Sequence, residues 1–172
     1  MTRVAEALDT LQNLASSEPV KSIADAFDQA GFELALVGGP VRDAFLGRSV
    51  NDLDFTTSAT PDQIEKLVAP LAEATWDVGR AFGTIAAKFG EHTIEITTYR
   101  ADSYDGQSRK PTVEFGDNLD DDLIRRDFTV NAMAVRVPGV VLVDPHGGLT
   151  DLTEGILRTP SSPEVSFADD PL

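Results

Sequence analysis

The stretch ELALVGGPVRDAFLGRSVNDLDFTT, residues 33–57, contains the pattern that decides the fold. The apolar run ELALV predicts a short buried strand, and the glycine pair that follows predicts a tight turn. PVRDAFLG predicts a short helix, because proline suits the first helical position and glycine suits the end. DLDFTT predicts a second strand. A strand, a glycine turn, a helix and a strand in so short a span indicate an α/β or α+β domain.

The rest of the chain predicts further elements around this unit. Helices are expected over residues 1–16, from a cap in SSEP to about residue 30, and over 60–74. Strands are expected over 84–90 and 93–99, joined by a hairpin at Gly90, and VVLVD is expected to pair with the end of LIRRDFTVNAMAVRV, which begins as a helix. Residues 101–122 are polar and acidic and predict a mobile loop. The expected fold is a small mixed sheet flanked by helices.

Composition limits the classes of function. The chain has 172 residues, a formal net charge of −15 and no cysteine. The acidic charge argues against a broad surface that grips nucleic acid, although it allows a local basic pocket. The lack of cysteine excludes disulfides and thiolate metal sites. No apolar run predicts a membrane span and no secretory signal is present, so we expect a cytoplasmic protein.

Asp52 and Asp54 lie two positions apart in the second predicted strand. Residues at this spacing point to the same face, with Cα atoms about 6.6 Å apart. Two neighbouring carboxylates repel each other unless a cation or water separates them. Mg²⁺ prefers oxygen ligands and completes its shell with water and phosphate. The alternative is a strand that merely turns a polar face to solvent.

The glycine pair before the short helix is the second candidate feature. Gly38 and Gly39 allow close approach of the backbone, and free N–H groups at the start of a helix attract anions. Arg42, on the first turn, is able to make a bidentate phosphate contact. An ordinary strand-to-helix turn explains the glycines equally simply. An anion site beside a cation site, however, suits a nucleoside triphosphate that carries Mg²⁺.

Two later segments contribute further candidates. Glu95 alternates with Ile94 and Ile96, so it is either a third carboxylate of the site or a charge on an edge strand. In RRDFTVNA, residues 125–132, Asp127 is a candidate to hold one arginine while the other reaches a phosphate. Asn131 is a candidate to bind a ribose or to organise the loop.

In this order, the segments LVGGPVRDAFLGRSVNDLDFTT, IEITTYR, RRDFTVNAMA and DPHGGLTDL resemble the head domain of class II CCA-adding enzymes and the related bacterial poly(A) polymerases. The resemblance runs from about residue 34 to the C-terminus. It implies a polymerase-β-like nucleotidyltransferase that transfers CMP or AMP from CTP or ATP to the 3′ end of a tRNA, with Mg²⁺. No side-chain nucleophile is needed for in-line attack by the primer hydroxyl.

The same resemblance assigns roles to individual residues. Asp52 and Asp54 match the metal ligands, and Glu95 matches a third acidic position. The nucleotide contacts are implied at Gly38, Gly39, Arg42, Arg125, Arg126, Asp127, Asn131 and the base-reading Asp170. Asp144 matches a connector between head and neck, with His146 as a turn residue. Serine often follows the two glycines in this superfamily; here it is Pro40, so phosphate contact at that point falls to Gly39 and Arg42.

The expected organisation is a helical segment over 1–33, a nucleotidyltransferase head over 34–158 and the start of a neck over 159–172. In the family an acidic pair, two spacers and an arginine select the base, and Asp169 and Asp170 fit the pair. We therefore expect a truncated catalytic head, impaired in activity, with tRNA held mostly by further domains. A poly(A) polymerase head and a non-catalytic nucleotide-binding module are the alternatives. The oligomeric state is left open.

Overall fold

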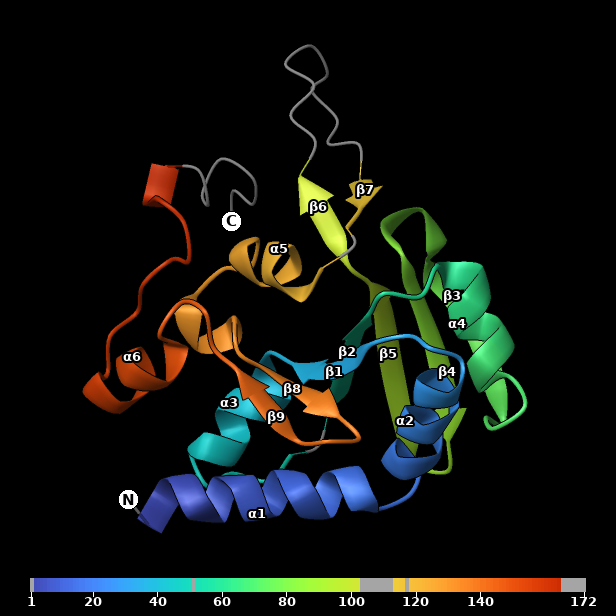
Figure 1. Ribbon diagram of the computed structural model, residues 1–172, viewed down its shortest axis with the longest axis horizontal. Coiled ribbons are helices and arrows are strands. Elements are labelled where there is room, and N and C mark those ends of the chain that lie inside the picture. The colour runs from blue at the N-terminus through green and yellow to red at the C-terminus, as the bar shows by residue number, and fades with distance from the viewer. Residues whose placement is uncertain (1, 51, 103–112, 117, 165–172) are drawn as a thin grey trace.

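The computed structural model describes residues 2–50, 52–102, 113–116 and 118–164. Its centre is a sheet of seven strands in the order β3-β4-β5-β2-β1-β8-β9, in which β2 and β5 are parallel and the other neighbours antiparallel (Figure 1). The strands are β1 Leu34–Val37, β2 Leu53–Thr57, β3 Ala74–Gly79, β4 Thr84–Phe89, β5 His92–Thr98, β8 Ala134–Val137 and β9 Val141–Val143. The predicted mixed sheet flanked by helices is confirmed.

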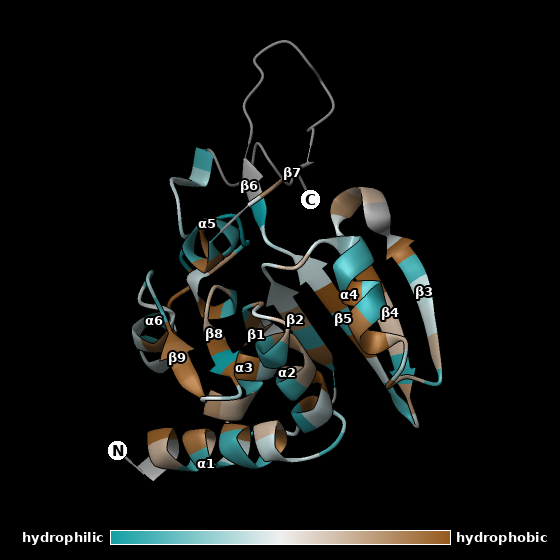
Figure 2. Ribbon diagram, turned by 45° about the vertical axis from the view of Figure 1, so that its right-hand side comes forward, coloured by the Kyte–Doolittle hydropathy of each residue, from teal (hydrophilic) through white to brown (hydrophobic). Residues whose placement is uncertain are grey.

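Four helices build the main core against one face of the sheet. They are α1 Thr2–Ser16, α2 Val20–Gln29, α3 Gly39–Phe45 and α4 Pro61–Val68. Alternate residues of the central strands, such as Phe55 and Ile96, enter this core because successive strand residues point to opposite faces. Hydrophobic and hydrophilic positions alternate along α1, as its brown and teal segments show in Figure 2. The helices thus leave the opposite face of the sheet available for a site.

Among the described residues, the opposite face is covered at one end only. There α5 (Leu119–Ile124) packs Leu119 and Leu123 against Tyr99 and Ala134, and a two-stranded ribbon of β6 (Arg100–Asp102) and β7 (Val113–Phe115) lies beside it. Asn118 caps α5 by accepting a hydrogen bond from the backbone N–H of Asp121 at 2.8 Å. This second cluster fixes the segment that follows α5.

Near the end of the described chain, α6 (Gly148–Glu154) packs on the 3₁₀ turn η2 (Thr129–Asn131). Both carboxylate oxygens of Asp144 accept backbone hydrogen bonds from the start of α6, at 2.7 and 3.0 Å. A Cβ on Gly148 would overlap the carbonyl oxygen of Thr129, so only glycine allows this close approach. The motif around residues 144–151 therefore sets the position of η2.

A short 3₁₀ turn, η1 (Arg80–Phe82), joins β3 to β4.

Three expectations about the elements were wrong. The edge strand β3 was not predicted, and the helix expected over 60–74 ends at Val68. The loop expected over 101–122 contains part of β6, all of β7 and part of α5, while residues 103–112 lie outside the described part. At the start of α2, Ser17 donates to the carbonyl of Asn13 at 2.6 Å and caps no N–H, and Pro19 takes the capping position.

The described helices include none with the length and apolar character of a membrane span.

Candidate functional site

The predicted carboxylates meet on the face of the sheet opposite the helices. Asp54 on β2 is the direct register partner of Glu95 on the neighbouring parallel strand β5, and neither residue is fully buried. Asp52 lies one residue before β2, on the same side of the alternation as Asp54. The prediction that Asp52 and Asp54 share a face is thus consistent with the strand register. Glu95 joins them from a strand 41 positions further along the chain than Asp54.

Glu95 does not lie at an edge of the sheet. Its strand, β5, has β4 on one side and β2 on the other. The interpretation of Glu95 as an edge-strand charge is therefore wrong. A charged side chain in the middle of a sheet, next to another carboxylate, needs a reason other than protection of an edge.

The electrostatics of this group favour a bound cation. Partial burial raises the pKa of Asp54, and repulsion from Glu95 and Asp52 raises it further, while Arg126 acts in the opposite direction. Within the described residues no three His, Cys, Asp or Glu side chains come close enough to enclose a metal ion by themselves. Two carboxylates with room for water and phosphate fit a hard divalent ion such as Mg²⁺, which rarely takes an all-protein shell.

The glycine turn has the backbone that only glycine adopts easily. Gly38 has φ 75° and ψ −130°, and the next residue begins α3. The N–H of Gly38 donates to the carbonyl of Met133 at 3.2 Å, so it extends the contact between β1 and β8 and is not free for a phosphate. A Cβ on Gly38 would lie 3.5 Å from Nη1 of Arg126. The turn thus brings the backbone directly under a guanidinium group.

Arg42 is held by a chain of side chains that reaches from α3 to η2. Its Nη1 donates to Oδ1 of Asn131 at 2.7 Å, and its Nε donates to Asp43 at 3.0 Å. The amide nitrogen of Asn131 donates in turn to both carboxylate oxygens of Asp127, at 3.0 and 3.1 Å. Of the two roles expected for Asn131, the contacts show the organising one, because both ends of its amide are already bonded.

Arg126 is positioned by Asp122, a residue that the sequence analysis missed. Nη2 of Arg126 donates to Oδ2 of Asp122 at 3.1 Å, and the other oxygen of this 5% exposed carboxylate accepts the backbone N–H of Arg100. Asp127 was the acid expected to hold an arginine, yet Arg126 binds Asp122. The spacing of four residues within DLIRR, residues 122–126, was the sequence pattern that offered this pair.

The remaining predicted residues lie in different places. Arg125 directly follows α5 and is partly exposed. Asp144 caps α6, and His146 follows it with a buried Nε2 that has no hydrogen-bond partner among the described residues. Asp169 and Asp170 lie outside the described residues, so the predicted base-reading position stays a prediction.

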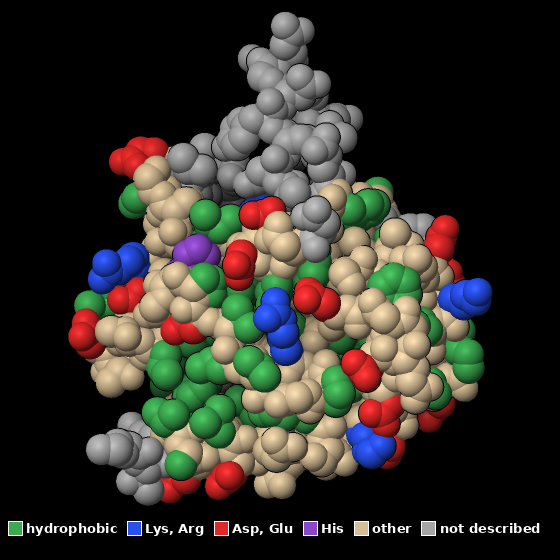
Figure 3. Space-filling view, viewed as in Figure 1, with side chains coloured by type: hydrophobic (Ala, Val, Ile, Leu, Met, Phe, Trp, Pro, Cys, Tyr) green, Lys and Arg blue, Asp and Glu red, His purple; other side chains and the backbone are tan. Residues whose placement is uncertain are grey.

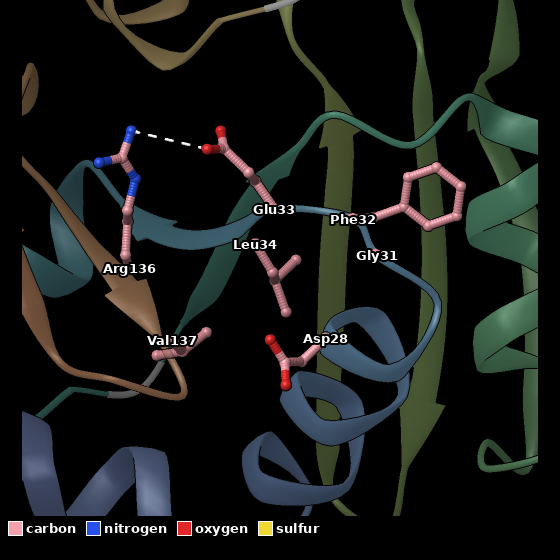
Figure 4. A pocket seen from close by; sticks show the side chains of 7 residues that line it. All are labelled: Asp28, Gly31, Phe32, Glu33, Leu34, Arg136 and Val137. Atoms are coloured by element: carbon pink, nitrogen blue, oxygen red, sulfur yellow. Dashed lines mark ion pairs between the residues drawn. The ribbon is translucent and has the colours of Figure 1, made fainter.

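Two pockets border these elements. One, of about 420 Å³, is lined by Arg42, Asp127 and Asn131 together with apolar side chains from α3, η2 and the end of α6. The other, of about 290 Å³, lies at the opposite end of β1, where Glu33 and Arg136 form an ion pair at 3.9 Å (Figure 4). Three predicted nucleotide-binding residues therefore share a pocket, whereas the second pocket contains none of them.

Charge on the surface is mixed. On the face that Figure 3 shows, the described basic side chains stand apart from one another among acidic and hydrophobic ones. Basic side chains on this face are thus isolated features of a chain whose net charge is −15.

A glycine turn under an arginine, next to paired carboxylates on an open sheet face, defines a nucleotidyltransferase head domain. The chain belongs to the poly A polymerase head domain family, whose model matches residues 34–158. It is 41% identical over 145 residues to a CCA-adding enzyme of Bacillus subtilis (strain 168), covering 84% of this chain and 35% of the relative. It is 35% identical over 167 residues to poly(A) polymerase I of Salmonella typhi, covering 91% of this chain and 35% of the relative.

A solved structure agrees with the sequence relatives. The Bacillus stearothermophilus CCA-adding enzyme in complex with CTP superposes with a TM-score of 0.75 at 32% identity, covering 99% of this chain and 37% of that one. The chain thus spans about a third of the length of these relatives.

Proposed function

We propose that this chain is the catalytic head of a tRNA nucleotidyltransferase that adds CMP and AMP from CTP and ATP to the 3′ end of tRNA. The observation that carries the proposal is the register pairing of Asp54 with Glu95, beside the glycine turn and Arg126. The similarity to CCA-adding enzymes, one of them solved with CTP, supports this choice of reaction and nucleotide.

In the proposed reaction, Asp52 and Asp54 hold Mg²⁺ through their carboxylate oxygens, with Glu95 as a nearby third acid. When bound, Mg²⁺ neutralises phosphate charge and lowers the pKa of the attacking hydroxyl. Glu95 is the register partner of Asp54 and repels its charge, and a bound cation relieves this repulsion.

The triphosphate is proposed to lie over the turn at residues 38–39. Arg126 supplies a guanidinium held by Asp122, and Arg42 supplies a second one held through Asn131. Gly39 contributes close backbone approach, and Pro40 has no N–H to offer. Guanidinium groups fixed by carboxylates and amides bind phosphate without first losing side-chain freedom.

With these groups in place, the 3′ hydroxyl of the RNA loses its proton to solvent, and its oxygen attacks the α-phosphorus of the nucleotide in line with the leaving group. A new P–O bond forms, the bond to the β-phosphate bridge breaks and pyrophosphate leaves. The chain stabilises the spreading negative charge with Arg42 and Arg126 and needs no covalent intermediate. Positioning and electrostatics supply the rate enhancement.

A poly(A) polymerase head is the second candidate, and the 35% identity to poly(A) polymerase I supports it. Both reactions use the same phosphate chemistry, so the residues of this site serve either. The non-catalytic alternative is disfavoured by the similarity to CCA-adding enzymes and to a poly(A) polymerase, both of which are enzymes.

The test is a chimera that joins this chain to the rest of the B. subtilis relative. The chimera, its Asp54→Asn form and the unaltered relative are incubated with tRNA lacking its terminal CCA, with Mg²⁺ and with each nucleotide, and the products are sequenced. Addition of CCA by the chimera and none by the Asp54→Asn form supports the proposal. Activity that survives the substitution would contradict it, and runs of A alone would favour the poly(A) reaction.

A further inference from the structure

The open face of the sheet extends the carboxylate site toward the β3 edge. Glu95, the partner of Asp54, is also the register partner of Ala86 on β4, and Ala86 is in turn the partner of Trp76 on β3. Direct register partners lie on the same face of a sheet. Asp54, Glu95, Ala86 and Trp76 therefore form one row across four strands. Three strand spacings separate its ends, about 14 Å.

The far end of the row carries exposed aromatic side chains. Trp76 is 41% exposed and Phe82 is 56% exposed, although both are large enough to be favoured in a core. Phe82 lies over Gly79, where a Cβ would come within 3.2 Å of its ring. Ala86, between Trp76 and Glu95, is fully buried. The short side chain of Ala86 therefore lies between the longer side chains of Trp76 and Glu95.

One arginine, Arg100, lies beside Phe82 in an otherwise acidic chain. Nε of Arg100 donates to the carbonyl of Phe82 at 3.0 Å. Burial lowers the pKa of Arg100, attraction to Asp122 opposes this lowering, and repulsion from Arg125 and Arg126 adds to it. Exposed rings next to an arginine, in register with a carboxylate site, match the chemistry of single-stranded nucleic acid, in which bases stack on rings and phosphates meet cations.

We propose that Trp76 and Phe82 form a stacking platform for the last unpaired bases of the acceptor RNA, and so position its 3′ hydroxyl over Asp54 and Glu95. The inference rests on the proposed function, because it assigns the second substrate to the same site. Trp76 and Phe82 are positioning residues, since neither lies at the reacting atoms. Stacking tolerates any base, so the platform serves an end whose sequence changes with each addition.

The chain supplies its own probe, because Trp76 is its single tryptophan. We expect a short single-stranded RNA that ends in CC to quench the fluorescence of Trp76 in a saturable way. A ribose-phosphate oligomer of the same length without bases should leave the fluorescence unchanged. Absence of quenching by the RNA would overturn the proposal. Quenching of equal size by Mg·CTP alone would also overturn it, because the platform would then hold the incoming base.

Variants separate stacking from folding. Labelled RNA should bind Trp76→Leu about 5- to 150-fold more weakly by fluorescence anisotropy, and Trp76→Phe should retain most of the affinity. Val141→Ala, which trims another exposed apolar side chain on β9 at the opposite edge of the sheet, is the matched control and should bind normally. Equal RNA affinity in Trp76→Leu and the unaltered chain would overturn the platform.

Calorimetry with Mg·CTP distinguishes failure of the proposed function from failure of the stacking platform. Trp76→Leu should bind Mg·CTP as the unaltered chain does, because the nucleotide site lies at the other end of the row. If the unaltered chain itself does not bind Mg·CTP, the proposed function fails and the platform fails with it. If Mg·CTP binding is intact while RNA binding ignores Trp76, only the platform fails.

Discussion

At the scale of single residues, Asp54 is a carboxylate whose ionised form is disfavoured by its surroundings in the folded chain. Its charge is disfavoured by partial burial and by two neighbouring carboxylates, and its pKa is raised. We predict that Asp54→Asn raises the melting temperature of the ligand-free chain at neutral pH while it removes Mg-dependent nucleotide binding. Thermal unfolding checks the first effect, with Asp9→Asn on the exposed side of α1 as the control. A lower melting temperature for Asp54→Asn would contradict the prediction.

The effect of Asp54 on stability should depend on pH with a defined sign. A raised pKa means that the folded chain holds the proton more tightly than the unfolded chain does. The ionised group therefore destabilises the fold above its folded-state pKa, and the penalty disappears as the pH falls below the unfolded value, about 3.9. The gap in melting temperature between Asp54→Asn and the unaltered chain should shrink from pH 7 toward about pH 4. A gap that grows on acidification would show the opposite linkage.

Asp122 acts through Arg126. We predict that Asp122→Asn weakens Mg·CTP binding about tenfold, because Asn keeps an acceptor for the backbone of Arg100 but loses the charge that fixes the guanidinium. Asp120 is also on α5 but is exposed, so Asp120→Asn is the control in the same calorimetric titration. An unchanged affinity in Asp122→Asn would mean that Arg126 does not need this partner.

At the scale of the elements, the central strands and the edge strand β9 were predictable, whereas β3 and the β6–β7 ribbon were not. β2 and β5 alternate apolar and polar residues because one face is covered by helices. β3 has mostly exposed residues and lacks that contrast, so its sequence does not distinguish a strand from a loop. The ribbon of β6 and β7 pairs across a polar interval, a long-range contact that local patterns do not encode.

The site residues also fall into those that the local sequence predicts and those that only long-range contacts bring together. Asp52, Asp54 and the glycine turn are recognisable locally, because their spacing within one segment carries the chemistry. The pairing of Glu95 with Asp54 depends on strand order, and the roles of Asp122 and Asn131 depend on contacts between distant segments. Arg42 and Asn131 are 89 positions apart, and only the packing of η2 against α3 brings them together.

The support of η2 by α6 gives a prediction at this scale. Gly148→Ala should destabilise the chain by about 1–3 kcal/mol, because the added methyl group forces α6 away from Thr129. Urea unfolding measures the change. Gly139→Ala is the control, since its Cβ would meet its nearest atom at an ordinary 3.8 Å. Equal stability of the two variants would contradict the close packing of α6 on η2.

At the scale of the whole molecule, we predict that this chain recognises the phosphate groups of a nucleotide and not its base. Arg42 and Arg126 are proposed to bind groups that CTP and ATP share, and the chain carries a net charge of −15 that opposes broad contact with RNA. We therefore predict similar affinities for Mg·CTP and Mg·ATP, within about threefold, a difference of 0.6 kcal/mol. Parallel calorimetric titrations check this. Strong preference for one base would place a base-reading group within this chain.

The central claim is that Asp52 and Asp54 hold the divalent ion of a bound nucleotide. The most direct measurement is calorimetric titration of the chain with CTP, with and without Mg²⁺, for the unaltered protein and for Asp52→Asn, Asp54→Asn and the control Asp9→Asn. The account predicts binding that requires Mg²⁺, that disappears in both site variants and that persists in the control. Nucleotide binding of unchanged affinity in Asp54→Asn, or binding indifferent to Mg²⁺, would contradict it.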